Sequence, residues 1–244
     1  MLNEKVALIT GSTSGIGLAT AHVLAAQGIN LVLHGLISAI QGQELADSFK
    51  AQYGIGVLFD NADLSDVASI EHLIKRAIEQ MGSIDILINN AGIQHTESAE
   101  NFPLDKWNAI IAINLSAAFH AIQYALPNMK SNGWGRIINV ASVHGLVGLT
   151  KVLALECAEQ GITVNAICPG WVDTPLINDQ ISAIAKQQDI AFEQAKYQLV
   201  TAKQPLPEMM APEQIGEFIL FLCSESARSI TGSALPMDGA WTAQ

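Results

Sequence analysis

The sequence predicts an α/β protein with a doubly wound parallel sheet, and three features lead to that class. Short apolar runs bounded by Gly, Asn or Asp recur along the chain. These runs are continuous rather than alternating, as in strands that are buried on both faces. Helical stretches separate them, and strand–helix alternation at this spacing implies right-handed crossovers. We therefore expect a single domain over residues 1–244, with about seven strands and with helices on both faces of the sheet.

The expected elements can be taken in order. Residues 15–27 are small and apolar, which favours a helix packed closely on the sheet, and residues 65–81 place an apolar stripe on one helical face. Ser65 and Asp66 supply a cap for that second helix. A three-turn helix is expected at 149–160, and a helical insertion at 174–207 is interpreted as a lid over one end of the sheet. The strands are expected at 6–10, 30–34, 56–59, 84–89, 136–141, 163–168 and 233–237.

Composition excludes several classes of partner. The 244 residues carry a formal net charge of −11, which argues against nucleic acids and anionic membranes because both bind basic surfaces. We find no apolar run of membrane-spanning length. Cys157, Cys168 and Cys223 lie in apolar settings, which predicts buried, reduced thiols of a cytoplasmic protein rather than a disulfide or a metal site.

Three glycines stand where the first expected strand turns into a helix. Gly11, Gly15 and Gly17 permit positive φ, close approach of backbone N–H groups to a pyrophosphate, and close packing of helix on strand. The N-terminus of the following helix then favours the anion. A merely tight turn is the alternative, but the position directly after the first strand favours a nucleotide site.

Taken together, the motifs resemble those of the short-chain dehydrogenase/reductase family. The glycine loop has the spacing G-x-x-x-G-x-G, Asn-Asn-Ala-Gly at 89–92 follows the fourth strand, and Pro169-Gly170 follows the sixth. This resemblance covers the whole chain and implies a Rossmann-type fold. It further implies that Asn114 supports a proton-relay water, that Ser142 hydrogen-bonds the reacting oxygen, and that Asp63 touches the adenine ring. The implied cofactor-binding residues are Gly11, Thr13, Ser14, Gly15, Ile16, Gly17, Leu36, Asp63, Leu64, Asn90, Ala91, Gly92, Pro169, Gly170, Val172 and Thr174.

The predicted cofactor is NAD. An acidic residue at the end of the second strand would bind the ribose hydroxyls of NAD, and a basic one would bind the extra phosphate of NADP. Here the strand ends in His34-Gly35-Leu36, and Ser14 occupies a loop position that is often basic in NADP enzymes of this family. Because no phosphate clamp is evident, NAD is favoured.

The substrate end resembles that of family members that interconvert D-3-hydroxybutyrate and acetoacetate. By this resemblance Gln94, His144 and Gln180 bind the substrate carboxylate, and Trp171 supplies an apolar wall. The resemblance also implies a role in ketone-body metabolism and a homotetramer, with no metal. Another short hydroxy acid or a sugar alcohol stays open as the substrate. A serine hydrolase is not predicted, because Thr13 takes the central position that a G-x-S-x-G elbow would need.

The family's proton acceptor, a Tyr followed four residues later by a Lys, is missing. The residues four positions after Tyr53, Tyr124 and Tyr197 are Val, Asn and Thr. Such a pair matters because a nearby ammonium lowers the pKa of the phenol that takes the hydroxyl proton. Residues 142–147 match the family's loop and 148–156 match the second half of its helix. By resemblance, roughly sixteen residues are therefore absent between Val147 and Gly148.

Three explanations for this gap are open. The natural protein carries a segment that this sequence lacks, or the segment is truly lost and the protein binds NAD without turnover, or another group serves as the base. A true loss should strip packing from a central helix, which favours the first explanation. The competing function is a non-catalytic nucleotide-binding protein.

Overall fold

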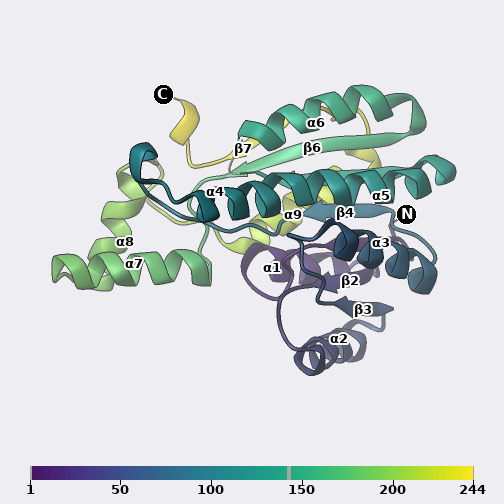
Figure 1. Cartoon of the computed structure of the whole chain (residues 1–244), viewed down its shortest axis with the longest axis horizontal. Helices are drawn as coiled ribbons and strands as arrows, with labels where there is room; N and C mark the ends of the chain where they lie inside the picture. Colours follow the sequence, from purple (N-terminus) through teal and green to yellow (C-terminus); the bar gives the residue numbers. More distant parts are fainter. Residues whose placement is uncertain (1, 142–143, 244) are drawn as a thin grey trace.

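A seven-stranded parallel sheet forms the centre of the molecule (Figure 1). The computed structural model describes residues 2–141 and 144–243. The strand order is β3-β2-β1-β4-β5-β6-β7, so the order reverses between β1 and β4, which is where ligands bind in sheets of this type. The predicted fold class is confirmed. The strands are β1 (Val6–Ile9), β2 (Asn30–His34), β3 (Val57–Asp60), β4 (Ile86–Asn89), β5 (Gly135–Val140), β6 (Ile162–Pro169) and β7 (Ala234–Met237).

Helices cover both faces of the sheet. One face carries α1 (Gly15–Ala25), α2 (Ala39–Tyr53) and α9 (Pro212–Cys223), whose apolar side chains join one buried cluster. The other face carries α3 (Val67–Met81), α5 (Ala117–Asn132) and α6 (His144–Cys157), which form a second cluster. Short 3₁₀ turns lie at η1 (Ala99–Asn101), η3 (Ala158–Gln160), η4 (Glu225–Ala227) and η5 (Trp241–Ala243).

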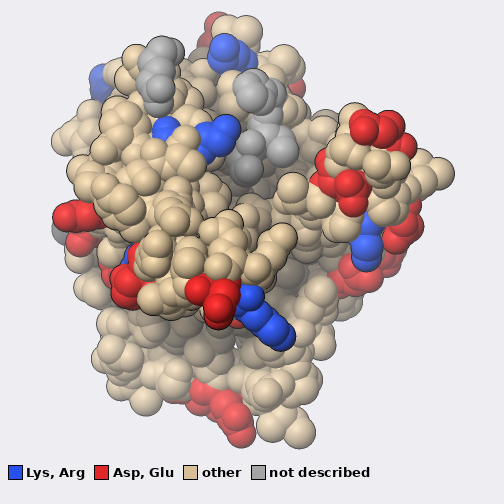
Figure 2. All heavy atoms as spheres, turned by 90° about the vertical axis from the view of Figure 1, so that its left-hand side faces the viewer, with Lys and Arg blue, Asp and Glu red and all other residues tan. Residues whose placement is uncertain are grey.

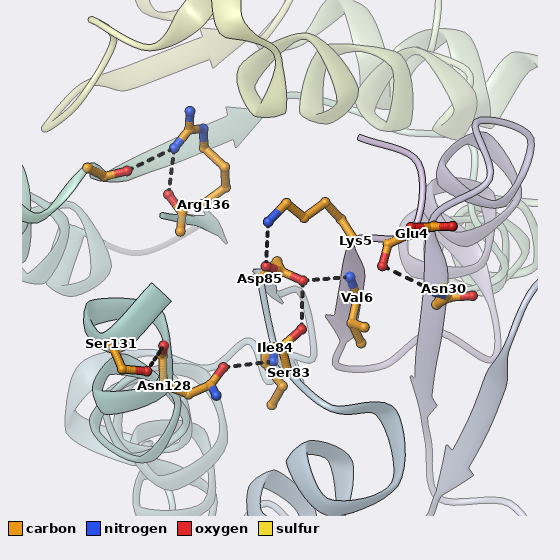
Figure 3. Close-up of polar contacts among 12 residues, drawn as sticks. Glu4, Lys5, Val6, Asn30, Ser83, Ile84, Asp85, Asn128, Ser131 and Arg136 are labelled. Atoms are coloured by element: carbon orange, nitrogen blue, oxygen red, sulfur yellow. Dashed lines mark hydrogen bonds and ion pairs between the residues drawn. The ribbon is translucent and has the colours of Figure 1, made fainter. Parts of the chain in front are cut away.

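The amino-terminal edge of the sheet is closed by polar contacts around Asp85 (Figure 3). Its carboxylate accepts hydrogen bonds from the backbone N–H of Val6 at 3.0 Å, from Lys5 Nζ at 2.8 Å and from Ser83 Oγ at 2.8 Å. These contacts tie the start of β1 to the start of β4. In parallel sheets of this type, ligands bind at the opposite edge, outside the carboxyl ends of the strands.

One long helix corrects an expectation from the sequence. The segments α4 (Leu104–Ile111), η2 (Ala112–Ser116) and α5 form a continuous helix of 29 residues, within which an 18-residue window reaches a mean hydropathy of 1.5, enough by length and composition alone to cross a membrane. The prediction that no apolar run reaches that length is therefore wrong. In the fold this helix packs against α3 and against strands β4 and β5, as a core helix of a globular domain does.

Helix α6 begins earlier than expected. Residues 144–147, predicted to be part of a loop, form its first turn, and the helix continues through Val147 and Gly148. Leu146, Thr150 and Leu153 are buried at helical spacing, so the shortened crossover still makes a packed helix. The loss of packing expected from a true deletion is not evident in this element.

The insertion between β6 and α9 is helical, as predicted. It consists of α7 (Pro175–Gln188) and α8 (Phe192–Thr201), which project beyond the carboxyl ends of the strands (Figure 1). Ile177, Ile181 and Ala195 form a small buried cluster of their own within it. These contacts do not test whether the insertion closes over a ligand, so its role as a lid stays a prediction.

The three cysteines are free. Cys157 and Cys223 are buried, as expected, whereas Cys168 is partly exposed and lines a cavity. Burial raises the pKa of all three thiols, that of Cys223 to about 12. The thiols therefore stay protonated at neutral pH.

Candidate dinucleotide and substrate site

A cavity of about 210 Å³ lies at the carboxyl ends of β1, β4, β5 and β6. It brings together residues that are far apart in the sequence and that the sequence assigned to one site. Of the predicted site residues, those that line it are Ile16, Asn90, Ala91, Gly92, Gln94, Asn114, Pro169, Gly170, Val172 and Thr174. The lining residues that sequence reasoning missed are Ile93, Val140, Ala141, Leu146, Leu176 and Ile177, which carry no polar signature.

The glycine loop packs too closely to accept side chains. A Cβ at Gly17 would overlap the carbonyl oxygen of Gly11 and would stand 2.5 Å from Asn90 Nδ2. Gly11 and Gly15 have φ of 66° and 53°, a region that glycine reaches without strain. A Cβ at Gly15 would lie 3.3 Å from Thr174 Cγ2, so the loop after β1 and the segment after β6 face one another.

The N-terminus of α1 is available to a ligand. Ser14 occupies the N-cap position but its side chain caps no backbone N–H, and the first turn holds no acidic residue. The first N–H groups of a helix have no partner within the helix, and together with the helix dipole they favour an anion. The tight glycine loop and these free donors fit the pyrophosphate of a dinucleotide.

Asn90 and Thr10 hold the loop against β4. Asn90 Nδ2 donates to the carbonyls of Thr10 at 2.9 Å and Gly11 at 3.0 Å. Thr10 Oγ1 in turn accepts hydrogen bonds from the backbone N–H groups of Asn90 and Ala91, both at 3.0 Å. Asn90, predicted from its motif, thus positions the loop through its amide.

His34, at the end of β2, also contacts the loop, which the sequence did not reveal. Its Nδ1 accepts from the backbone N–H of Gly11 at 3.2 Å, and its Nε2 lies 2.9 Å from the carbonyl oxygen of Ala62. Burial lowers the pKa of His34, while the Ala62 carbonyl and the charge of Asp60 act in the opposite direction. In the sequence, His34 is marked only by its position at the end of an apolar strand, and nothing there indicates its contact with Gly11.

Asn114 lies in the π-helical turn η2, in the middle of the long helix. Its Oδ1 accepts from the backbone N–H of Ile93, and its Nδ2 donates to the Ile93 carbonyl, both at 2.9 Å. Such π turns are frequent at functional sites. The side chain is thereby fixed at the wall of the cavity.

The expected adenosine end carries little positive charge. Leu36 is 75% exposed just after β2, and Ser14 is exposed on the loop. Thr13 packs against Gly35, where a Cβ would stand 2.5 Å from the Thr13 methyl group. Asp63 is exposed and accepts from Ser65 N–H and Oγ, contacts that lower the pKa of its carboxyl, while Leu64 is buried.

A second cavity of about 610 Å³ adjoins the first and shares Gln94 with it. Trp171 lines it, stacked on Trp241 with ring centroids 5.7 Å apart. Gln180 is exposed on α7 and is not among the lining residues of either cavity. The structure therefore brings Gln94 and Trp171 together and leaves Gln180 outside.

The predicted Ser142 and the side chain of His144 lie outside the described part of the chain. Among the described residues that line the two cavities there is no Tyr, Lys or His. Cys168 is a poor general base because burial raises its pKa. Asp238 Oδ2 is engaged by Thr242 through its N–H at 3.0 Å and its Oγ1 at 2.6 Å.

Figure 2 shows the face of the molecule on which α7 and α8 lie. It is formed mostly by uncharged side chains, and acidic side chains gather on the protruding part at the right of that view. The surface of this face therefore suits a small ligand held by specific polar contacts rather than a polyanion.

The chain is similar to known proteins over nearly its whole length. Residues 11–242 match the family model described as enoyl-(acyl carrier protein) reductase. The fold is similar to L-sorbose reductase from Gluconobacter frateurii, solved with NADPH and L-sorbose, with a TM-score of 0.92 and 30% identity, over 98% of this chain and 96% of that chain. Levodione reductase is similar as well, with a TM-score of 0.89, 30% identity, and 100% and 99% of the two chains covered.

Two curated relatives carry the same name. D-beta-hydroxybutyrate dehydrogenase of Cupriavidus necator is 49% identical over the full length of both chains, and that of Rhizobium meliloti is 43% identical over 98% of this chain and 99% of its own. The first alignment spans 260 positions, whereas this chain has 244 residues. By that difference, about sixteen aligned positions have no residue here.

Proposed function

Because the chain belongs to the short-chain dehydrogenase/reductase family, a family of oxidoreductases, we propose that the protein interconverts (R)-3-hydroxybutyrate and acetoacetate with NAD(H) when the missing Tyr and Lys segment is in place. The observation that carries the proposal is the convergence of the glycine loop, Asn90, Asn114 and Gln94 on one cavity. The bound cofactor supplies the hydride acceptor. The protein binds the cofactor, orients the hydroxy acid and excludes water.

The choice of NAD over NADP is part of this proposal. The residues at the expected adenosine end, Leu36 and Ser14, have no charge with which to bind a ribose phosphate. A phosphate buried without a cationic partner is costly, whereas ribose hydroxyls need only neutral hydrogen-bond partners. The sorbose reductase was solved with NADPH, so the relative affinity of this chain for NAD and NADP is the test of the choice.

The substrate is proposed to lie where the two cavities meet. Gln94 lines both, and its amide can donate to a carboxylate, while Trp171 provides an apolar wall for a short carbon chain. We propose His144 and Gln180 as further carboxylate ligands and Ser142 as the donor to the reacting oxygen. Gln180 must approach from its exposed place on α7, which motivates closure of α7 and α8 over the substrate.

Proton transfer is assigned to residues that this 244-residue chain does not contain. The described lining residues include no Tyr, Lys or His, burial raises the pKa of the Cys168 thiol, and the Asp238 carboxylate already accepts two hydrogen bonds from Thr242. About sixteen positions of the Cupriavidus necator alignment are empty in this chain, the same number as in the Tyr and Lys segment that we propose is absent between Val147 and Gly148. We therefore propose that the chain as given binds its ligands, and that turnover requires that segment.

A second function is favoured by one observation. Helix α6 is continuous through Val147 and Gly148 and buries Leu146, Thr150 and Leu153, so the shortened chain is well packed there. A protein that has truly lost the segment would be a folded dinucleotide-binding protein without activity. The intact mass of the protein from its native source separates the two: 26.0 kDa supports a true loss, and a larger mass supports a longer, active protein.

The proposal is tested with two forms of the protein. One is the 244-residue chain, and the other carries the corresponding segment of the Cupriavidus necator relative inserted between Val147 and Gly148. We expect both to bind NADH in a fluorescence titration and only the longer form to produce NADH from (R)-3-hydroxybutyrate. A longer form that folds and binds NADH but oxidises no short hydroxy acid would overturn the proposed activity.

The proposal includes a cytoplasmic homotetramer. Phe119 on α5 and Val152 and Leu155 on α6 are exposed apolar side chains, with exposed fractions of 43%, 64% and 84%. A shared apolar face on two neighbouring helices supports contact with another copy of the chain. The three free cysteines fit a reducing compartment.

A further inference from the structure

His34 contacts the first residue of the glycine loop and the segment after β3 at the same time. The Gly11 N–H donates to Nδ1 at 3.2 Å, so Nδ1 carries no proton in this arrangement. The Ala62 carbonyl, 2.9 Å from Nε2, can only accept, so the ring proton lies on Nε2. Both partners therefore select one neutral tautomer of the imidazole.

The same residue holds the loop through its backbone. The Ser12 N–H donates to the His34 carbonyl at 2.8 Å, and the His34 N–H donates to Ser12 Oγ at 2.8 Å. The Gly11 carbonyl accepts from Asn90 Nδ2 at 3.0 Å. Gly11 is thus bound on both sides by side chains, and its N–H points to His34 rather than to a ligand. The donors left for an anion are those at the start of α1.

We propose that His34 is a positioning residue of the dinucleotide site: its neutral imidazole fixes Gly11, and the site loses affinity for the pyrophosphate when the imidazole is protonated. Protonation would place an N–H on Nδ1 opposite the Gly11 N–H, so that two donors face each other and the start of the loop must move. This inference rests on the proposed dinucleotide binding.

The surrounding charges set the direction of the pH effect. Asp60 on β3 is the charged group that acts on the imidazole, and Arg76 on α3 forms an ion pair with it. Burial outweighs Asp60 and the Ala62 carbonyl and lowers the pKa of His34 from 6.5. The neutral form therefore predominates above pH 6.5, and affinity should be constant there and fall as the pH drops through the lowered pKa.

Two amide variants test the hydrogen bonds of the two ring nitrogens separately. In His34→Asn the side-chain oxygen can take the place of Nδ1 and accept from Gly11, with no proton to gain. In His34→Gln the longer amide can reach the Ala62 carbonyl as Nε2 does, but leaves the Gly11 N–H without its acceptor. The probe is ADP-ribose, which carries the pyrophosphate without the nicotinamide, titrated by calorimetry between about pH 5 and pH 8.

The wild type should bind with a constant Kd above pH 6.5 and progressively more weakly below it. His34→Asn should bind within about threefold of the wild type at neutral pH and keep that affinity in acid, and His34→Gln should bind about tenfold more weakly throughout. Thermal unfolding of each variant reports whether it is folded. The dependence of the wild-type affinity on pH is decisive even if one of the variants is not folded.

Three results would overturn the inference: a wild-type affinity that does not change with pH, an Asn variant with the wild-type profile, or a folded Gln variant that binds as the wild type does. A wild type that binds no ADP-ribose at neutral pH would instead overturn the proposed dinucleotide function. The two failures are therefore distinguishable.

Discussion

The side-chain amide of Asn114 makes two reciprocal hydrogen bonds, each of 2.9 Å, with the backbone N–H and carbonyl of Ile93. This pair joins the π-helical turn in the long helix to the loop after β4. Ile93 and its neighbour Gln94 line the cavity, so the position of that wall depends on the pair. Asn114 therefore positions the loop in addition to any role in a proton relay.

Replacing Asn114 with Ala should destabilise the protein and loosen this wall. A hydrogen bond contributes about 0.5–1.5 kcal/mol net to stability, so loss of the two bonds should cost about 1–3 kcal/mol in the free energy of unfolding. Urea denaturation measures the change. Asn108→Ala, at an exposed position on α4 of the same long helix, is the control and should change stability by less than about 0.5 kcal/mol. Equal effects of the two substitutions would contradict the role given to the Asn114–Ile93 pair.

Substitution of Gly17, the buried glycine of the loop, should lower both the affinity for NADH and the stability of the fold. A Cβ in Gly17→Ala would meet the Gly11 carbonyl and Asn90 Nδ2, and overpacking of this kind costs about 1–3 kcal/mol. NADH affinity should fall about tenfold or more, because the loop must move to relieve the overlap. Fluorescence titration and thermal unfolding give the two readouts.

Gly148→Ala is the matched control for that substitution. Nothing lies within 4 Å of a Cβ built at Gly148, which is exposed in α6. Alanine should stabilise this helix by about 0.5–1 kcal/mol and leave NADH binding unchanged. Wild-type affinity in Gly17→Ala would refute the proposed close approach of the loop to the cofactor.

A positive charge at Leu36 should change the preference between cofactors. Leu36 is 75% exposed just after β2, where the ribose of the adenosine is proposed to lie. Leu36→Arg should tighten NADP binding about tenfold, since a guanidinium pairs well with a phosphate. Leu104→Arg, at an equally exposed position on α4, controls for net charge. A similar gain in both variants would mean that Leu36 does not contact the ribose.

Much of the fold could be read from the chain because its signals are local. Continuous apolar runs predict strands buried on both faces, and the expected range for β2 agrees with the observed Asn30–His34. The helix expected at 65–81 begins at Val67, because Asp66 caps it by accepting from the N–H groups of Ala68 and Ser69. Helical periodicity sets the type of an element, while a single side-chain contact sets where it begins.

The parts that were missed depend on contacts between distant segments. Residues 144–147 carry no signal that distinguishes a loop from the first turn of α6; burial of Leu146 against the sheet decides it. His34 acts on Gly11 only because β1 and β2 are neighbours, with Ile9 paired to Leu33. Many of the residues predicted to bind the cofactor line one cavity because their motifs stand at strand ends, which meet at one edge of a parallel sheet.

The central proposal is that this chain binds NAD and a short hydroxy acid without turnover, because the described residues lining the two cavities include no Tyr, Lys or His to accept the hydroxyl proton. A single-turnover measurement tests it most directly. The purified 244-residue chain, with its mass verified, is mixed with (R)-3-hydroxybutyrate and with a limiting amount of NAD, and the absorbance of NADH is followed. The account predicts saturable binding of NAD and no NADH above the rate without protein. A burst of NADH stoichiometric with the limiting NAD would contradict it.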